Sequence, residues 1–189
     1  MLFRSLSRIT AAGTGVRIRT DRRRVGTSWF ATGLGAQAVD AGRVAILRGD
    51  AVRLLRVTNG SVLRTFRATA PVDVALQGST MVVLQRPFRN RTLAVYDLRR
   101  RRIATWPARG AGLGGDLASK QGVDVHRGIA TFPVGRSVHV LRARDGRERV
   151  LKAPRVVVAA QIEASGLVYA YGARLVFVPR TQLVSLLGH

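Results

Sequence analysis

The sequence contains no cysteine, which excludes disulfide bonds and thiolate metal sites. It also lacks any apolar run near the roughly 18–20 residues that a bilayer-spanning helix needs. Close to the N-terminus, Arg4 and Arg8 interrupt the hydrophobic residues, so no signal-peptide core of about 7–15 apolar residues is present. These absences predict a chain without a membrane span or an export signal, cytoplasmic by default.

Acidic residues and lysine are scarce. The 10 Asp and Glu residues stand against 32 Lys and Arg, and the formal net charge is +22. Lys120 and Lys152 are the only lysines, so nearly all of the positive charge is arginine. A strongly basic surface attracts polyanions, and guanidinium groups bind phosphate bidentately. GC-rich coding would also favour arginine over lysine, although it does not explain the shortage of acids. Polyanion binding and compositional bias therefore both remain open.

A fourfold repeat stands out against this composition. Each copy opens with an apolar residue and an acid, continues two to five residues later with a glycine, and then has two apolar runs separated by a turn. The glycines are Gly42, Gly78, Gly128 and Gly166, at spacings of 36, 50 and 38 residues. Such spacings are expected when four strands form one propeller blade. The repeat predicts an all-β fold, a partial β-propeller of about four blades built from four-stranded antiparallel sheets.

The repeats divide the chain into a short leading segment and a propeller. Residues 1–28 are a basic N-terminal segment, in which Leu6–Thr10 and Val16–Thr20 are possible strands of a preceding blade. Residues 29–189 hold the blades, at about 29–68, 71–108, 120–153 and 155–189. The inner strand of the first blade is expected around Trp29–Asp40, and Thr181–Leu187 is a possible fourth strand of the last blade.

These strands do not add up to a closed ring. In a closed ring the two ends of the chain share one four-stranded blade, so two leading strands would be completed by two trailing strands. The last repeat already has three clear strands, one too many for a closed four-blade ring. We therefore expect an open, incomplete propeller. Its unpaired edges are expected to permit self-association.

Tight turns are predicted at two corresponding places. Thr58–Gly60 and Arg144–Gly146 end in Asn-Gly and Asp-Gly, which tolerate the positive φ angles of short hairpin turns.

Two pairs of segments resemble the outer hairpin of a blade in the WD40-like and PQQ-like β-propeller superfamily. They are Ala94–Asp97 with Ile103–Trp106, and Val57–Gly60 with Leu63–Phe66. The tail from Ala160 to Pro179 is similar to the C-terminus of uncharacterised propeller proteins from GC-rich actinobacteria. The resemblance covers about residues 29–187 and implies a propeller fold. It implies no particular activity, because propellers host many unrelated functions.

The sequence departs from both branches of that superfamily. No Trp-Asp dipeptide ends an outer strand and no Gly-His pair precedes a blade, so the WD40 hydrogen-bond network is not expected. Trp29 and Trp106 are the only tryptophans, whereas quinone-binding propellers carry them regularly. No cofactor is therefore predicted, and a quinone-dependent dehydrogenase fragment is a distant alternative.

No motif indicates catalysis or a metal. Gly110–Gly115 matches G-x-G-x-x-G, but Asp116–Gln121 after it is too short for the helix that binds pyrophosphate, so a loop is predicted. Gly26–Phe30 fails the last position of a nucleophile elbow. The three histidines, His126, His139 and His189, do not have metal-ligand spacing. We predict no catalytic, cofactor-binding or metal residue, and no enzyme.

The recurring acids are candidate channel-lining carboxylates. They are Asp40, Asp73, Asp124 and Glu163, predicted in the innermost strand of each repeat. Strand alternation is expected to place Asp73 on the opposite face from Val72 and Val74. A carboxylate ring in so basic a protein would bind a cation or a basic ligand. Alternatively, each acid pairs with arginines of neighbouring blades or holds a backbone turn.

Arginines gather at the predicted turns of both faces of the disc. The candidate polyanion contacts lie between third and fourth strands: Arg99, Arg100, Arg101, Arg102, Arg142, Arg144 and Arg147. Others lie between second and third strands, on the opposite face: Arg48, Arg86, Arg89, Arg91, Arg136 and Arg174. Only Phe88 offers an aromatic ring for stacking on a nucleic acid strand. The even distribution predicts diffuse electrostatics.

These features together favour a non-enzymatic interaction or structural scaffold with an unknown protein partner. The alternative is an arginine-rich module that binds nucleic acid or an anionic lipid surface. Affinity for duplex DNA that falls steeply with salt would distinguish the second from the first.

Overall fold

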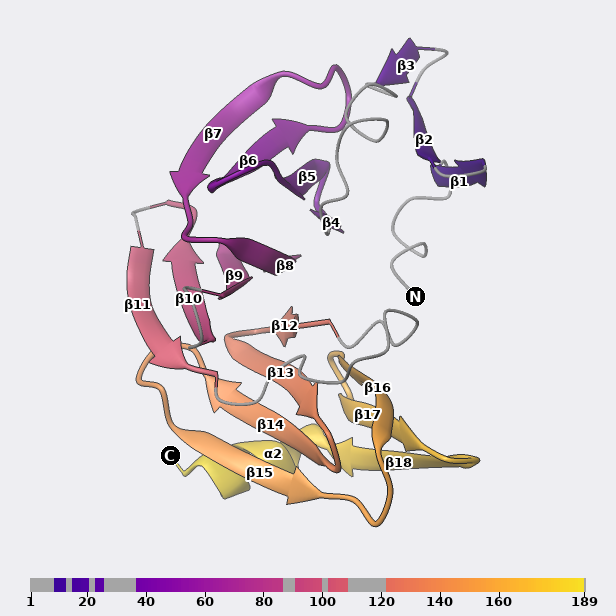
Figure 1. Cartoon of the computed structure of the whole chain (residues 1–189), viewed down its shortest axis with the longest axis vertical. Coiled ribbons are helices and arrows are strands. Elements are labelled where there is room, and N and C mark those ends of the chain that lie inside the picture. The colour runs from indigo at the N-terminus through magenta and orange to yellow at the C-terminus, as the bar shows by residue number, and fades with distance from the viewer. Residues whose placement is uncertain are drawn as a thin grey trace.

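The computed structural model describes residues 9–12, 15–20, 23–25, 37–86, 91–99, 102–108 and 122–188. Four antiparallel sheets follow one another along an arc, in the order of the sequence (Figure 1). This confirms the predicted all-β, partial β-propeller fold. Among the described strands no pairing joins the first sheet of the arc to the last. No helix among the described residues is long and apolar enough to cross a membrane.

Each sheet is built from strands that are neighbours in the chain. The first holds β4 (Gln37–Asp40), β5 (Arg43–Leu47), β6 (Ala51–Arg56) and β7 (Val62–Arg67). The second holds β8 (Pro71–Gln77), β9 (Thr80–Gln85), β10 (Thr92–Asp97) and β11 (Arg102–Pro107). The third holds β12 (Asp124–His126), β13 (Ile129–Val134), β14 (Ser137–Arg142) and β15 (Glu148–Lys152). The fourth has only three strands, β16 (Val157–Ile162), β17 (Gly166–Tyr171) and β18 (Arg174–Pro179).

The predicted fourth strand at Thr181–Leu187 is wrong. Helix α2 (Arg180–Leu187) occupies this segment. Pro179 cannot donate to a strand ladder and is tolerated at a helix start, so the chain changes conformation here. Leu183 and Leu187, four residues apart on one helix face, are buried in the cluster between the third and fourth sheets. Their spacing is the signal that the strand prediction overlooked.

The N-terminal segment also differs from the prediction. It forms a separate three-stranded sheet of β1 (Ile9–Ala12), β2 (Gly15–Thr20) and β3 (Arg23–Val25) instead of two strands. Within the predicted inner strand around Trp29–Asp40, the described part is β4. The predictions for Gly26–Phe30, Gly110–Gly115, Asp116–Gln121 and His189 fall outside the described residues, as do those for Phe88, Arg89, Arg100 and Arg101.

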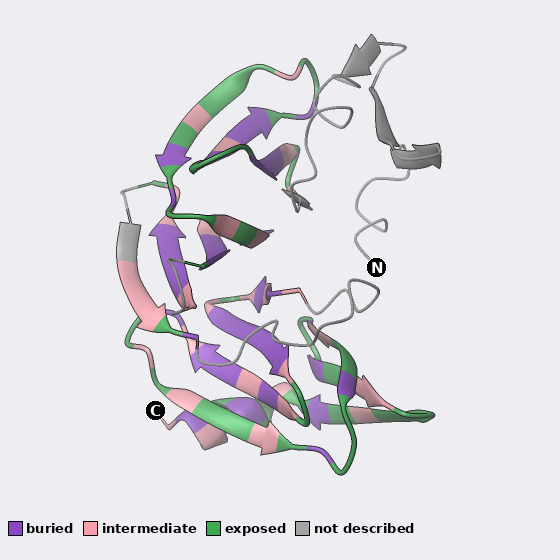
Figure 2. Ribbon diagram, in the orientation of Figure 1, coloured by how far each residue is buried: buried purple, intermediate pink, exposed green. Residues whose placement is uncertain are grey.

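Hydrophobic side chains fill the spaces between neighbouring sheets. Three clusters lie between sheets one and two, two and three, and three and four. The second strands of the first three sheets are buried almost continuously, because both of their faces are packed. The fourth strands β7 and β15 are mostly exposed (Figure 2).

Repeated backbone hydrogen bonds define two rims of the arc. On one rim, the residue after the third strand donates to the first hairpin: Val57 to Gly42, Leu98 to Ser79 and Ala143 to Gly128, all at 2.8 Å. On the other rim, the residue after the fourth strand donates to the turn between second and third strands: Ala68 to Asp50, Ala108 to Arg91 and Ala153 to Arg136. We call the first the mixed-charge rim (residues 41–42, 57–61, 78–79, 98–99, 127–128, 143–147 and 164–165). The second is the arginine rim (residues 48–50, 86, 91, 135–136 and 172–173, with links 68–70 and 153–156).

The two predicted tight turns are confirmed on the mixed-charge rim. Gly60 and Gly146 have φ angles of 71° and 72°. Asn59 Oδ1 accepts the Ser61 N–H at 3.0 Å, and Asp145 Oδ1 accepts the Arg147 N–H at 3.2 Å. Each turn is thus held by its own side chain, as Asn and Asp do in hairpins.

Candidate functional site

The recurring acids do not occupy equivalent positions. Asp40 ends β4, and Glu163 follows β16 at a hairpin, whereas Asp73 and Asp124 lie further from the hairpin on β8 and β12. The spacing between acid and glycine varied from two to five residues, and this variation corresponds to the depth of the carboxylate along the inner strand. The four carboxylates therefore lie at different depths along the inner strands.

Asp73 and Asp124 each join their own sheet to the next. Asp73 Oδ1 accepts the Val74 N–H at 2.8 Å and Oδ2 accepts the Val123 N–H at 2.7 Å. Asp124 repeats the arrangement one sheet further, since Oδ1 accepts from Val125 and Oδ2 from Ile162, both at 2.8 Å. Both oxygens of each carboxylate are thus bonded to backbone amides.

A β-bulge explains how Asp73 reaches this position. The register of β8 against β9 shifts between Pro71 and Asp73. Val72 is consequently exposed while Val74 is buried, so the expectation that these two valines share a face is wrong. A bulge inserts one residue and redirects the side chains before it.

Burial dominates the electrostatics of these two carboxyls. It raises the pKa of Asp73 to about 6, although the hydrogen bonds from Val123 and Val74 act in the opposite direction. The neighbouring Asp124 charge raises it further. The pKa of Asp124 is raised for the same leading reason, burial.

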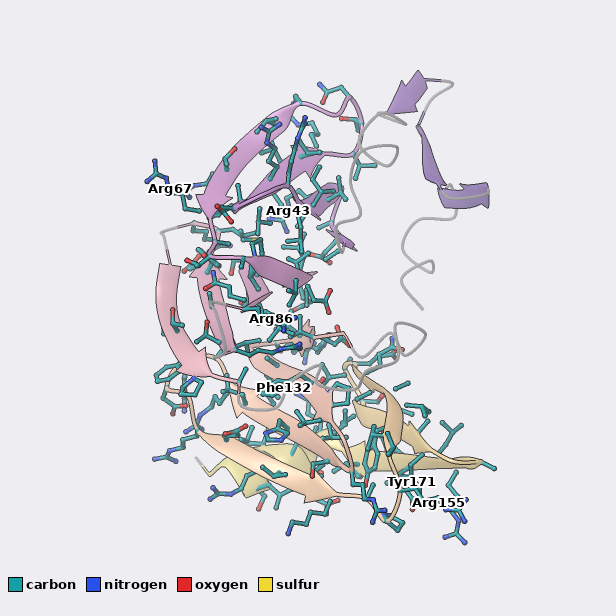
Figure 3. The ribbon with its side chains drawn as sticks, in the orientation of Figure 1. Arg43, Arg67, Arg86, Phe132, Arg155 and Tyr171 are labelled. Atoms are coloured by element: carbon teal, nitrogen blue, oxygen red, sulfur yellow. The ribbon has the colours of Figure 1, made fainter. Side chains whose placement is uncertain are left out.

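A second set of bonds links the first hairpins on the mixed-charge rim. Asp40 Oδ2 accepts the Gly78 N–H at 2.7 Å, and Arg43 Nη2 donates to the Gly78 carbonyl at 2.6 Å. One sheet further, Gln77 Oε1 accepts the Arg127 N–H at 2.9 Å, and Arg180 Nη2 lies 3.5 Å from the Arg127 carbonyl. Figure 3 shows Arg43 between the first two sheets.

Sequence reasoning missed Gln77 and Arg180 as partners in this set. The available signal was position, because Gln77 directly precedes its hairpin glycine and Asp40 lies two residues before Gly42. Glu163 has a different contact, from Gln161 Nε2 to Glu163 Oε1 at 2.9 Å within its own sheet. In the described part of the chain, no three His, Asp or Glu side chains come together as a metal site.

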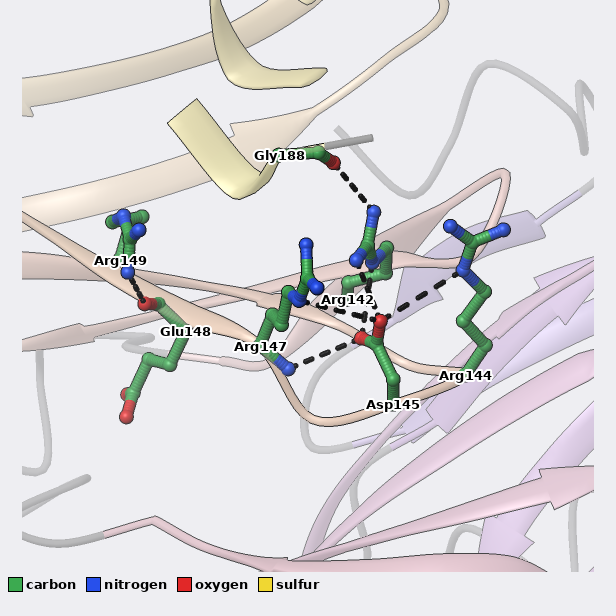
Figure 4. A network of polar contacts seen from close by, with 7 residues as sticks. All are labelled: Arg142, Arg144, Asp145, Arg147, Glu148, Arg149 and Gly188. Carbon is green, nitrogen blue, oxygen red and sulfur yellow. Dashed lines mark hydrogen bonds and ion pairs between the residues drawn. The ribbon is translucent and has the colours of Figure 1, made fainter. Parts of the chain in front are cut away.

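Three of the candidate polyanion contacts on the mixed-charge rim, Arg142, Arg144 and Arg147, surround Asp145 (Figure 4). Arg142 donates to both oxygens of Asp145 at 3.0 and 2.6 Å, and its Nη1 donates to the Gly188 carbonyl at 2.6 Å. Nε of Arg144 and Nε of Arg147 each lie 3.9 Å from Asp145 Oδ2. Arg142 therefore holds the end of α2 against the β14–β15 turn, and part of the positive charge here is neutralised.

The remaining candidates on this rim are less defined. Arg99 is exposed, and its backbone N–H donates to Asp97 Oδ1 at 2.8 Å. Arg102 opens β11, and Arg100 and Arg101 lie outside the described residues. Of the seven candidates, the structure thus brings Arg142, Arg144 and Arg147 together around Asp145.

The arginine rim has little compensating charge. Its described cations stand on turns, links and adjoining strand ends of all four sheets: Arg48, Arg67, Arg86, Arg91, Arg136, Lys152, Arg155 and Arg174. Asp50 is the only acid among the described residues of these turns and links. None of the eight cations forms an ion pair with a described carboxylate. Figure 3 labels three of them, Arg67, Arg86 and Arg155, on separate parts of the arc.

Arg86 and Arg91 illustrate the excess charge. They flank the turn between β9 and β10, and the pKa of Arg91 is lowered, first by burial and then by the like charge of Arg86. At this turn, Arg86 and Arg91 therefore lie close enough to repel each other.

Solved structures share this arrangement of sheets. Kluyveromyces lactis Hsv2 is similar with a TM-score of 0.56 at 9% identity, over 77% of this chain and 47% of that one. The β-propeller domain of Myceliophteria thermophila Cps50 (Swd1) gives 0.54 at 12% identity, over 73% and 48%. A chain of the mitotic checkpoint complex gives 0.52 at 14% identity, over 72% and 44%.

The fold is that of a partial β-propeller. The chain spans a little under half the length of each of these three structures. No protein-family model matches it, and no curated protein sequence is significantly similar to it. At these identities the likeness concerns the fold alone.

Proposed function

We propose that this chain is a non-enzymatic, propeller-type interaction scaffold that binds an acidic protein partner along its arginine rim. The proposal rests on the eight cations of the arginine rim. Among the described residues of the turns and links of that rim, Asp50 is the only acid that could compensate their charge. Propellers commonly use turn residues held by a rigid sheet framework for binding. The similarity of the tail at Ala160–Pro179 to actinobacterial propeller proteins is a separate prediction from the sequence, and the proposed function does not depend on it.

The arginine rim supports this function better than the turn set predicted from the sequence. Arg142 is bonded to Asp145 and Gly188, and Arg43 is 3.3 Å from Asp40, so both have intramolecular partners. The cations of the arginine rim keep their charge available to another molecule. Because they come from four sheets, a partner would have to extend across several blades to contact most of them.

A second candidate is polyanion binding, to nucleic acid or to an anionic lipid surface. The same uncompensated rim favours it, since arginine binds phosphate as well as carboxylate. The two candidates differ in salt dependence, because each phosphate contact on duplex DNA adds about one unit to the log–log slope.

Charge reversal on matched rims tests the proposal. The double variant Arg86→Glu, Arg136→Glu alters the arginine rim, and Arg99→Glu, Arg144→Glu alters the mixed-charge rim by the same net charge. We expect the first to lose binding of a labelled poly-glutamate peptide by at least about tenfold at physiological ionic strength, and the second to retain it. Equal losses would show that binding follows net charge and would overturn the assignment to this rim.

Duplex DNA and phosphatidylserine vesicles serve as parallel probes. The scaffold proposal expects the peptide to bind more tightly than either probe at physiological ionic strength, although salt should weaken its binding too, because it screens the attraction between glutamates and arginines. Steep, salt-sensitive binding of DNA or vesicles, without peptide binding, would replace the scaffold with the polyanion-binding alternative.

A further inference from the structure

The last sheet of the arc ends in a strand that is paired on one side only. In the first three sheets a fourth strand pairs with the third, whereas β18, the third strand of the last sheet, pairs with β17 alone among the described strands. Helix α2 follows β18 but leaves this edge open, because Leu183 and Leu187 pack into the cluster between the third and fourth sheets. An unpaired strand presents backbone N–H and C=O groups to which another strand can bond.

The alternation of bonds between β17 and β18 shows which groups these are. Just beyond the end of the pairing, the Arg180 N–H donates to the Ser165 carbonyl at 2.9 Å. Bonded and non-bonded pairs alternate in an antiparallel ladder. Counting back along β18 from Arg180, Leu175 and Phe177 therefore fall in non-bonded pairs. Their N–H and C=O groups point away from β17 toward the free edge, where no described residue bonds to them.

The third sheet uses the corresponding residues to hold its own fourth strand. Counted from the two-residue turn before each strand, Leu175 of β18 corresponds to Val138 of β14. Phe177 corresponds in the same way to Val140, and both valines pair with residues of β15. The free edge of β18 therefore has bonding groups at the spacing that a fourth strand requires.

The side chains along this edge indicate the chemistry of a segment that pairs there. Leu175 is 78% exposed and Phe177 53%, and residues 175–178 include neither a charge nor a proline, which commonly protect edge strands. Arg174 is exposed at the start of β18, and Arg155 reaches the turn before it. Neither arginine forms an ion pair with a described carboxylate. Apolar side chains therefore suit the middle of the edge, and acidic side chains suit its arginine end.

We propose that an extended segment of an acidic partner protein adds to β18 as a fourth strand. The proposal deepens the proposed function and rests on it for the acidic character of the partner. In the antiparallel direction that the other sheets show, the segment places one apolar residue opposite Phe177 and a second opposite Leu175. Acids that follow them then reach Arg174 and Arg155. In strand addition of this kind, main-chain bonds supply affinity and alternate side chains supply specificity.

Fluorescence anisotropy with the labelled peptide Thr-Val-Thr-Val-Glu-Glu tests the pairing on the full chain. The two valines are expected opposite Phe177 and Leu175, so N-methylation of both valines should weaken binding by at least about tenfold, because it removes their N–H donors. N-methylation of both threonines is the matched control and should leave binding unchanged, since alternate N–H groups face away from β18. The reversed peptide Glu-Glu-Val-Thr-Val-Thr has the same composition and should also bind at least about tenfold more weakly.

Changes in the protein provide a second test. Leu175→Pro removes one N–H group of the free edge, a position at which a strand tolerates proline, and should weaken binding of the unmodified peptide. If this variant does not fold, the N-methylated peptides still test the wild type. Hydrogen exchange of the Leu175 and Phe177 amides should be fast in the free protein and slow with the unmodified peptide bound.

Three results would overturn the proposal. The unmodified peptide fails to bind, all the peptides bind equally, or the two amides already exchange slowly in the free protein because the chain itself or a second copy covers the edge. The poly-glutamate test with Arg86→Glu, Arg136→Glu probes other sheets. Selective loss of poly-glutamate binding there, without an effect of valine N-methylation here, would overturn the strand addition and leave the proposed function standing. The converse would leave the strand addition and remove the role of the whole rim.

Discussion

Trp106 of β11 packs against Gly146 in the β14–β15 turn. A Cβ placed on Gly146 would lie 2.4 Å from Cε3 of the indole and 2.6 Å from Cδ2 and Cζ3. Gly146 also has a φ of +72°, where residues with a side chain are strained. The contact joins the outer strand of the second sheet to a turn of the third, so one glycine serves both the hairpin and the packing of two blades.

Gly146→Ala should lower the free energy of unfolding by about 2–3 kcal/mol, because it combines backbone strain with a steric clash. The control is Gly135→Ala, whose φ of +55° is also left-handed but which has no atom within 4 Å of the added Cβ. That variant should lose only about 1 kcal/mol. Urea unfolding of both variants measures the difference, and equal losses would mean that the indole moves aside at little energetic expense.

Asp73 should make the protein less stable as pH rises from about 4 to about 6. Its pKa in the folded protein is about 6, above the ordinary value of 3.8, so the native state holds the proton over a range in which the unfolded chain has lost it. The resulting loss of unfolding free energy is at most about 3 kcal/mol and is complete above about pH 7.

Asp73→Asn removes this titration. The difference in unfolding free energy between wild type and variant, measured by urea unfolding at several pH values, should change across that range and be flat above it. Asp124→Asn should show a change of the same sign, because the pKa of Asp124 is also raised. A pH-independent difference for Asp73→Asn would contradict the expected protonation.

Arg142→Lys should loosen helix α2. Lysine cannot reproduce the bidentate bond to Asp145 together with the bond to the Gly188 carbonyl. Hydrogen exchange of the Leu183 and Leu187 amides should therefore accelerate relative to amides of β9. Arg144→Lys is the matched control, since Arg144 lies 3.9 Å from Asp145 and makes no described bond to α2.

The same ion pair should weaken in strong acid. The side-chain hydrogen bond from Arg142 lowers the pKa of Asp145 to about 2, below the ordinary value of 3.8. The stabilisation is present above the unfolded value and is lost as pH falls through about 2. Protection of α2 amides in the wild type should decrease over this range, and Arg142→Lys should show a smaller decrease.

Millimolar calcium or zinc should leave the thermal midpoint unchanged. Both oxygens of Asp73 and of Asp124 already accept backbone N–H groups, so a cation would have to displace bonds that join the sheets. Differential scanning fluorimetry with and without each metal measures the effect. A rise of several degrees would support the alternative, a cation site among the inner-strand carboxylates.

Much of the fold could be predicted because it depends on local signals. The repeated acids and glycines place the inner strands and first hairpins, and Asn59 and Asp145 identify two of the outer turns. The helix at the C-terminus was missed because a short apolar segment fits either a strand or a helix, and only packing of Leu183 and Leu187 decides between them.

The contacts of the candidate site were less predictable. Whether Asp73 meets an arginine, a cation or the Val123 amide depends on the bulge at Val72 and on how closely the next sheet approaches, neither of which has a sequence pattern. The arginine rim was visible only as scattered turns. Its excess charge became evident when the turns of four sheets were found to share one side of the arc.

The hydrogen bonds by which Asp73 and Asp124 link different sheets join only neighbouring sheets. Together with clusters that likewise involve neighbouring sheets, they give the arc the energetics of a one-dimensional array, in which each unit is stabilised by itself and by adjacent units. Interior units then have two stabilising neighbours and the terminal units one. Opening should consequently begin at the ends of the array and move inward, with the second and third blades the last to lose their structure.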